Sequence, residues 1–259
     1  YCWRGGLRSG SMVTWLRLVG WDAQQLAGGY KAFRGHVIEQ LETQVPQLQM
    51  RVLCGATGSA KTRVLHALAE RGEQVLDLEG YANHKGSLLG GLPGIEQPSQ
   101  KRFETLLAEQ LETFDLSRPV YLEGESAKIG RVGLPLVLVQ HLHKAPVIEV
   151  RATTAARLSY LLRDYAYLGD DPEALATKLG WLKELQGKET VGRWQQWART
   201  KELPPLFEEL MLRHYDPHYE RSQSNHFQQW PQRQVLETDD LSDEAIVRMA
   251  EQVMALEAR

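Results

Sequence analysis

The strongest chemical signal in the sequence is a short glycine-containing run between an apolar segment and a helical one. It reads Gly-Ala-Thr-Gly-Ser-Ala-Lys-Thr at residues 55–62, which matches the pattern G-x-x-x-x-G-K-[ST] except at Ala60. Glycines let successive backbone N–H groups turn inward around an anion, and the following helix directs its positive dipole end there. We therefore predict a phosphate or diphosphate site formed by Gly55, Thr57, Gly58, Ser59, Lys61 and Thr62.

Three positions in this run have distinct predicted roles. Lys61 would reach the terminal phosphate oxygens, and Thr62 would offer its hydroxyl group to Mg²⁺. Ala60 stands where the pattern has its second glycine, and its methyl group costs little if the backbone there is already near helical. A glycine-rich turn without a ligand is the alternative interpretation. The strand before the run and the helix after it make that alternative weaker.

Carboxylates follow the next two predicted strands. Asp77 and Glu79 end one strand, and Glu123 ends the other. Ligands of open α/β sheets bind at the carboxyl ends of the strands, so these side chains could hold Mg²⁺ or its waters. A solvated carboxylate at a strand end is an equally good interpretation of each. Further polar candidates for the same site are His84, Lys85, Lys128 and Arg131.

A second reactive feature lies near residue 1, in the run Tyr-Cys-Trp-Arg-Gly-Gly-Leu-Arg-Ser. Cys2 begins a glycine-containing loop that closes on Arg8. The backbone N–H groups of such a loop and the charges of Arg4 and Arg8 favour the thiolate, which is the nucleophilic form of cysteine. Arg8 can also hold an oxyanion through two hydrogen bonds. Cys54, on an apolar strand, is predicted to be inert.

The elements that position these residues alternate between strand and helix. Strands are predicted at residues 50–54, 74–78, 119–123 and 147–150, and helices at 62–71 and 100–114. After residue 154 the sequence predicts helices and no strand, the last helix covering 242–258. This pattern predicts an α/β fold with a parallel sheet followed by a helical tail. The predicted divisions are residues 1–35, 36–153 and 154–259.

Composition excludes several other classes of protein. The 259 residues are 42% hydrophobic and 24% charged, with a net charge of −3, so the chain is neither disordered nor a strongly basic nucleic-acid binder. No apolar run approaches the roughly 18 residues that cross a membrane. Two cysteines far apart give no disulfide framework. A reducing, cytoplasmic location without membrane contact is therefore expected.

The two reactive loops together resemble a known family. A cysteine-led loop closing on Arg-Ser resembles the rhodanese active site, and with a phosphate loop after it the chain resembles the tRNA 2-selenouridine synthases, in which a rhodanese domain is fused to a P-loop domain. Residues 28–32, 77–87 and 121–130 also match that family. The resemblance implies that residues 1–35 are the C-terminal part of a rhodanese-like domain, most of whose sheet precedes the cysteine loop. The full-length protein would then be bifunctional.

The resemblance also implies a reaction. In the family the sulfur of 2-thiouridine at the wobble position of tRNA is exchanged for selenium from selenophosphate, through an S-geranylated intermediate made from geranyl diphosphate. Cys2 matches the selenium-carrying cysteine, and residues 55–62 match the phosphate-binding loop, with Ala60 departing from the family's glycine. The implied substrates are tRNA and small phosphorylated donors, with no tightly bound cofactor.

A tRNA substrate requires cations for its phosphates and planar groups for unstacked bases. Candidates in the helical tail are Arg193, Trp197, Arg199, Arg213 and Arg221, although tryptophans at helical spacing are usually core residues. Two other classes of function stay open at this point. One is a P-loop kinase or NTPase that acts on a small molecule and carries a vestigial rhodanese segment. The other is a non-catalytic module that binds RNA or a partner.

Overall fold

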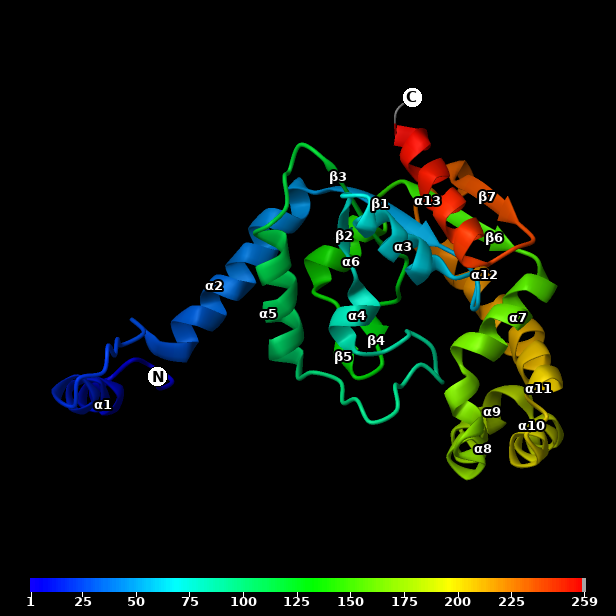
Figure 1. Ribbon diagram of the computed structural model, residues 1–259, viewed down its shortest axis with the longest axis horizontal. Helices are drawn as coiled ribbons and strands as arrows, with labels where there is room; N and C mark the ends of the chain where they lie inside the picture. The colour runs from blue at the N-terminus through cyan, green and yellow to red at the C-terminus, as the bar shows by residue number, and fades with distance from the viewer. Residues whose placement is uncertain (258–259) are drawn as a thin grey trace.

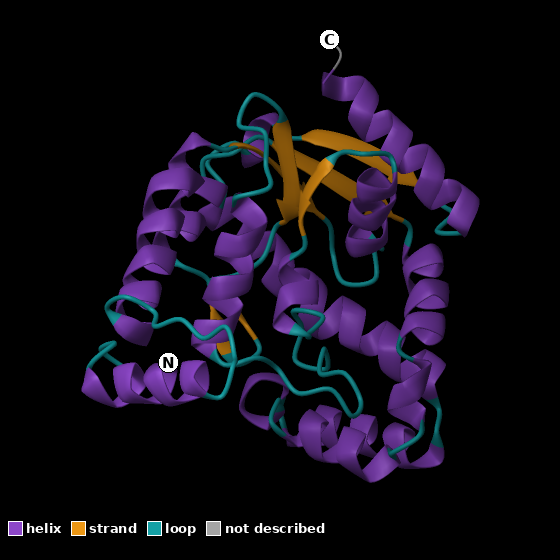
Figure 2. Ribbon diagram, turned by 60° about the vertical axis from the view of Figure 1, so that its left-hand side comes forward, coloured by secondary structure: helices purple, strands orange, loops and turns teal. Residues whose placement is uncertain are grey.

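A parallel β-sheet forms the centre of the computed structural model, which describes residues 1–257 (Figures 1 and 2). Within those residues its strand order is β2-β3-β1-β6-β7, and every neighbouring pair is parallel. The strands are β1 (Gln49–Cys54), β2 (Gln74–Leu76), β3 (Pro119–Glu123), β6 (Val147–Ala152) and β7 (Gln234–Thr238). The connection that leaves β1 runs to β2 on one side, whereas the connection that leaves β3 runs to β6 on the other side of β1. The two connections therefore diverge at the carboxyl ends of β1 and β3, where ligands of such sheets bind.

Helices cover both faces of the sheet, because alternate residues of each central strand point to opposite sides. On one face Val52 and Leu122 pack against α2 (Gly29–Gln44), α5 (Gln100–Leu111) and α6 (Leu136–Leu142). On the other face Leu53 and Tyr121 pack against α3 (Lys61–Glu70) and α13 (Asp243–Glu257). Residue 258, the end of the predicted last helix, lies outside the described residues.

A separate group of helices packs beside the sheet around the buried Trp194. The elements that complete the fold are α1 (Leu7–Leu18), α4 (Leu78–Ala82), α7 (Thr154–Asp164), α8 (Pro172–Gly180), α9 (Lys183–Gln186), α10 (Lys188–Thr200), α11 (Leu203–Leu210), the π-helix Met211–Tyr215, α12 (Asp216–His226), the 3₁₀ turns Val45–Gln47, Ala166–Gly169 and Trp230–Gln232, and the hairpin strands β4 (Lys128–Ile129) and β5 (Val132–Gly133). No helix in residues 1–257 is both long enough and apolar enough to cross a membrane.

The predicted parallel α/β fold and its four strands are confirmed, with two corrections. The expectation of no strand after residue 154 is wrong, because β7 pairs with β6 and forms an edge of the sheet. The second strand ends at Leu76 rather than at residue 78. The cause is local: the Asp77 carboxylate accepts a hydrogen bond of 2.7 Å from the Gly80 N–H and so caps α4.

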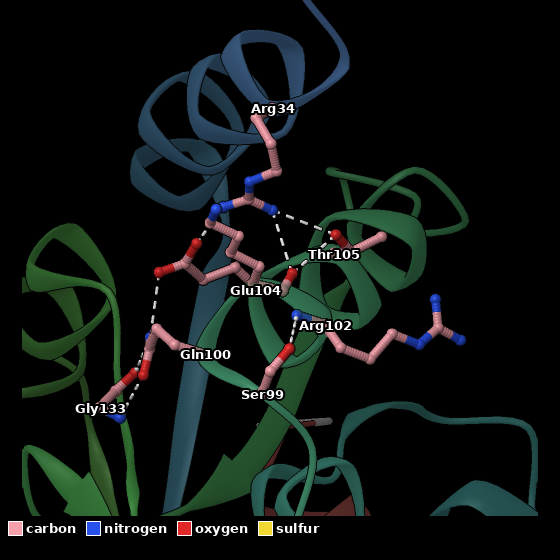
Figure 3. A network of polar contacts seen from close by, with 8 residues as sticks. Arg34, Ser99, Gln100, Arg102, Glu104, Thr105 and Gly133 are labelled. Atoms are coloured by element: carbon pink, nitrogen blue, oxygen red, sulfur yellow. Dashed lines mark hydrogen bonds and ion pairs between the residues drawn. The ribbon is translucent and has the colours of Figure 1, made fainter. Parts of the chain in front are cut away.

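A buried arginine joins α2 to α5. The Arg34 guanidinium donates to the Lys101 carbonyl at 3.0 Å and to the Thr105 hydroxyl at 3.1 Å, and it forms an ion pair with Glu104 (Figure 3). Gln100 extends the network, because its amide nitrogen donates to the other Glu104 oxygen at 3.0 Å. The network therefore fixes the helix that leads from the N-terminal segment onto the sheet.

We predict that Arg34→Ala lowers the free energy of unfolding by about 2 kcal/mol, because it leaves Glu104 and the Lys101 carbonyl without their partner in a largely buried place. Urea denaturation measures the change. The matched control is Arg102→Ala on the same helix, whose ion pair with Glu109 is 3.6 Å long and exposed, so its loss costs about 0.5 kcal/mol or less. Equal effects of the two substitutions would contradict the prediction.

Candidate active site

The glycine-containing run forms a loop from the carboxyl end of β1 to the start of α3, as predicted. Gly55 is required there, because a Cβ atom on it would lie 2.2 Å from the Ser59 Oγ and 2.9 Å from the Val150 carbonyl oxygen. Gly58 has a φ of +85°, and a Cβ atom on it would lie 2.8 Å from Leu161. The loop therefore packs its backbone closely against β6 and α7, which leaves no room for side chains at these two glycines.

Ala60 departs from the expectation of a near-helical backbone. Its φ of 60° and ψ of 24° lie in the left-handed region, and it is the residue that precedes the first turn of α3. A left-handed backbone costs an alanine about 1 kcal/mol relative to glycine. Ala60 is also buried, so its methyl group recovers a similar amount through apolar contact.

Two exchanges of glycine and alanine in this loop should have unequal effects. Gly58→Ala combines left-handed strain with the clash against Leu161, so we predict a loss of about 3 kcal/mol in the free energy of unfolding. Ala60→Gly relieves strain but deletes a buried methyl group, so its effect should stay within about 0.5 kcal/mol. Chemical denaturation of both variants checks this. A large change in the free energy of unfolding for Ala60→Gly would show that backbone strain and methyl burial at this position do not cancel.

Lys61 lies between two acidic side chains at the mouth of the loop. Its Nζ is 3.1 Å from the Glu79 Oε1 and 3.1 Å from the Glu125 Oε1. The Thr62 hydroxyl donates to the other Glu79 oxygen at 3.0 Å. The lysine and threonine that the motif assigns to phosphate and metal are thus held by carboxylates, and an entering phosphate would replace the carboxylates on Lys61.

The charges in this group depend strongly on one another. Burial alone would lower the pKa of Lys61, but the neighbouring carboxylates of Glu79, Glu125 and Glu123 outweigh burial and hold that pKa well above its usual value. Burial raises the pKa of Glu125 to about 7, although Lys61 opposes the shift. Burial, with the charges of Asp77 and Glu79, raises the pKa of Glu123 well above its usual range. Lys61 therefore stays protonated, whereas Glu123 and Glu125 are protonated at a higher pH than ordinary carboxylates.

Glu123 and Asp77 are positioned differently from the sequence-based expectation of a common metal site. The Glu123 side chain is buried, and its Oε2 accepts a hydrogen bond of 3.0 Å from the Leu78 N–H. Asp77 caps α4 and contacts the His66 Nε2 at 2.8 Å. This hydrogen bond raises the pKa of His66. Both carboxylates thus hold the start of α4 against the sheet, and that helix carries Glu79.

A cavity of about 460 Å³ opens in front of the loop. Four of its lining residues form what we call the tyrosine wall: Tyr160 of α7, Tyr165 just after α7, Tyr215 of the π-helix and Tyr219 of α12. The hydroxyl groups of Ser59 and Tyr219 are buried without a hydrogen-bond partner among the described residues. Buried donors of this kind generally have partners, and both belong to residues that line the cavity.

The residues at the loop fit a magnesium ion that is shared with a phosphate. Mg²⁺ usually keeps several waters and binds one or two protein oxygens together with substrate phosphates. The hydroxyl group of Thr62 and the carboxylate of Glu79 provide two such oxygens. Among residues 1–257, no group of three or more His, Cys, Asp or Glu side chains is arranged to hold a metal by itself.

Sequence reasoning missed Glu125 and the tyrosine wall, and it grouped some cations that the structure separates. Lys85 borders the cavity, where its Nζ forms an ion pair of 2.7 Å with Asp164 and lies 4.4 Å from the centre of the Tyr165 ring. Lys128 and Arg131 instead line a neighbouring hollow with His84. Glu125 follows Glu123 by two residues, which was a signal that could have placed it on the same edge of the sheet.

Cys2 lies in the segment before α1, outside the phosphate cavity, and its carbonyl accepts a hydrogen bond of 3.0 Å from the Tyr30 N–H at the amino end of α2. Its Sγ is 3.2 Å from the Ser9 Oγ. The hydrogen bond with Ser9 and the backbone N–H groups of Gly6, Arg4 and Gly5 lower the pKa of Cys2 to about 7. Hydrogen bonding is therefore the main cause of the lowered pKa, rather than the expected guanidinium charges of Arg4 and Arg8. Cys54 is buried on β1, and burial raises its pKa.

Ser9→Ala should raise the pKa of Cys2 from about 7 toward the ordinary value of about 8.5, because it removes the largest stabilising contact of the thiolate. A lowered pKa means that the thiolate is populated above about pH 7, so the alkylation rate of the variant should rise only at higher pH. The pH profile of iodoacetamide labelling measures this. Ser11→Ala, an exposed serine on the same helix, is the matched control. Identical profiles for both variants would contradict the assignment.

Most of the predicted RNA-contacting residues have partners inside the protein. Arg193 donates to Glu209 at 2.9 Å, and Arg213 lies 3.5 Å from the same carboxylate. Arg199 donates to Glu173 at 3.0 Å. The other two candidates differ: Trp197 packs on the helical core around Trp194, and Arg221 is exposed. Their contact with RNA stays a prediction.

The strand order, the loop at the end of β1 and its lysine define a P-loop α/β protein. The family model described as the tRNA 2-selenouridine synthase AAA domain matches residues 48–181, just over half of the chain. The chain belongs to the tRNA 2-selenouridine synthase family.

Curated relatives agree with this membership. The tRNA 2-selenouridine synthase of Alcanivorax borkumensis is 42% identical over 167 residues, which are 64% of this chain and 45% of that protein. The enzyme of the same name from Nitrosomonas europaea is 39% identical over 168 residues, which are 64% of this chain and 43% of that protein. The match thus spans somewhat under half the length of each.

Likenesses to solved structures are distant. A shikimate kinase from Acinetobacter baumannii, solved with shikimate, has a TM-score of 0.35 and 19% identity, with 85% of this chain and 97% of that chain covered. A sugar kinase from Janibacter has a TM-score of 0.31 and 11% identity, with 80% of this chain and 95% of that chain covered.

Proposed function

We propose that this chain contributes both reactive sites of a transferase that replaces the sulfur of wobble 2-thiouridine in tRNA by selenium. The phosphate loop binds geranyl diphosphate for an S-geranylation step, and Cys2 delivers selenium that originates from selenophosphate. The support is the family membership together with the geometry of the two sites. Residues 1–35 act with the rest of a rhodanese-like domain in this proposal, and the reaction takes place in the cytoplasm.

One observation carries the geranyl step: a diphosphate cradle and a tyrosine wall share one cavity of about 460 Å³. Phosphate binding alone would need only the loop, Lys61 and a polar wall. A geranyl group adds an apolar chain and positive charge that develops on its first carbon as the diphosphate leaves. Aromatic side chains suit both requirements, since they bury apolar surface and attract cations over their faces.

The order of the two steps follows from leaving-group chemistry. In the first step the bond between geranyl carbon and diphosphate oxygen breaks, a bond between that carbon and the 2-thio sulfur forms, and the uridine N3 proton is lost to solvent. In the second step the selenium atom of selenophosphate, positioned by the Cys2 loop, attacks C2 of the base, and geranyl thiolate departs. Water then cleaves the selenium–phosphorus bond, so that phosphate leaves, N3 regains a proton and 2-selenouridine remains. Alkylated sulfur leaves more readily than a free 2-thio group. Geranylation therefore precedes selenation.

Nucleoside mass spectrometry tests the proposal. The native protein is incubated with tRNA that contains wobble 2-thiouridine, first with geranyl diphosphate and Mg²⁺, and then with selenophosphate. The expected products are S-geranyl-2-thiouridine and afterwards 2-selenouridine. Rapid turnover of ATP without either product would instead support a P-loop kinase or NTPase and overturn the proposal.

A further inference from the structure

A second hollow of about 600 Å³ lies beside the phosphate cavity. Its walls come from the segment 83–97, the β4–β5 hairpin and the residue that follows α8. Figure 1 shows the connection from α4 to α5 extending toward α8 before it returns along the hairpin. Gly86 and Ser87 belong to the walls of both hollows, so a single strip of chain separates the two spaces.

Cations with free head groups gather at this hollow. Lys128 and Arg131 are exposed on the hairpin and form no ion pair within residues 1–257. Lys178 of α8 is near enough for its charge to act on His84, a wall residue, and it too has no ion pair there. Glu96 is the acidic residue among the lining side chains of the described chain. A local positive charge thus occurs in a protein with a net charge of −3.

The same hollow also has an exposed aromatic side chain in its lining. Trp181 lines the hollow and is 65% exposed, although it follows a helix whose other face is well packed. Unpaired cations beside an exposed tryptophan are typical of sites for single-stranded nucleic acid, where phosphates meet the charges and an unstacked base lies on the ring. An acidic peptide would use the cations but leave the indole ring without a stacking partner.

We propose that this hollow binds a single-stranded loop of RNA, with Lys128 and Arg131 on its phosphates and Trp181 stacked on an unpaired base. The identity of that RNA as the tRNA anticodon loop rests on the proposed function. Because the hollow and the phosphate cavity share a wall, a nucleotide next to the stacked base lies within reach of the phosphate loop. RNA bound in this hollow would not require Arg193, Arg199 or Arg213, which form ion pairs with carboxylates of the protein.

Fluorescence anisotropy with a labelled anticodon stem-loop that contains 2-thiouridine tests this inference on the native protein. Lys128→Ala combined with Arg131→Ala should weaken binding about tenfold and reduce the slope of log affinity against log salt by about 1.4. Trp181→Ala should weaken binding about tenfold at constant salt slope, and Trp181→Phe should retain most of the affinity. Lys188→Ala with Lys201→Ala removes the same charge from exposed positions on and beside α10 and should change affinity little.

The outcomes separate this inference from the proposed function. The hollow variants should bind geranyl diphosphate with unchanged affinity, and their KM for tRNA should rise while kcat at saturating tRNA is retained. RNA affinity that is unchanged in both the double variant and Trp181→Ala, in a protein that still geranylates tRNA, overturns the inference alone. A native protein that binds neither the RNA nor geranyl diphosphate overturns the proposed function and the inference with it.

Discussion

Lys61→Ala is expected to reduce geranyl transfer about 100-fold or more, because a positioned cation on departing phosphate oxygens commonly supplies a rate factor of that size. Lys61 is held 3.1 Å from both Glu79 and Glu125, so its ammonium group already stands at the mouth of the loop. Lys85, another cation on the cavity wall, is engaged by Asp164. The measurement is the rate of S-geranyl-2-thiouridine formation, together with the affinity for geranyl diphosphate by calorimetry.

The loss must be separated from unfolding, because Lys61→Ala leaves two carboxylates in a buried place without their cation. Thermal unfolding of the variant gives that check, and Lys61→Arg provides a second variant that keeps the charge. The arginine variant should fold normally and still lose most of the transfer rate, since its planar head group differs in shape from an ammonium group. Normal geranyl transfer by a folded Lys61→Ala protein would contradict the role assigned to the loop.

The phosphate loop could be predicted because every determinant lies within one short run of sequence. The apolar strand, the glycines, the lysine and the helix are neighbours along the chain, so local pattern and local structure coincide. The capping role of Asp77 also depends on residues close in sequence, because its partner is the Gly80 N–H. It was missed because the apolar residue Leu78 continues the pattern of the strand, while the hydrogen bond to Gly80 starts a helix instead.

Strand β7 could not be read from the sequence for a different physical reason. It is an edge strand whose Gln234 and Glu237 are exposed and whose apolar residues are half-buried. Such a strand carries little periodic signal, and its pairing with β6 over residues 148–152 depends on the fold. The tyrosine wall also depends on the tertiary fold. Tyr160 and Tyr219 lie far apart in sequence and line the same cavity only because α7 and α12 pack beside the loop.

The sequence-based assignment of arginines to RNA shows the same limit. Arg193 and Arg199 lie on α10, where composition alone suggests a basic face. Whether they are free depends on the acids of the neighbouring helices, because Glu209 of α11 and Glu173 of α8 reach them only after the helices pack. Lys128 and Arg131 lie on a short hairpin and form no ion pair within the described residues, which is why we propose this hairpin rather than α10 as the RNA-binding surface.

Cys2→Ser in the full-length native protein is expected to stop selenium incorporation and to leave geranyl transfer at its normal rate. A serine hydroxyl group neither carries selenium nor ionises near pH 7, whereas the Cys2 thiol has a pKa of about 7. The two steps should separate because Cys2 is no part of the phosphate cavity and lies at the other end of α2 from the sheet, a helix of 16 residues and roughly 24 Å.

Nucleoside analysis should therefore find S-geranyl-2-thiouridine accumulating in the Cys2→Ser protein, with no 2-selenouridine. Cys54→Ser is the matched control, since it removes the other thiol of the sequence and its hydroxyl group can still donate to Gln223 as the thiol does. That control should complete both steps. Equal loss of geranylation and selenation in Cys2→Ser would mean that the cysteine loop and the phosphate loop act on the same step, and the division of chemistry between them would have to be abandoned.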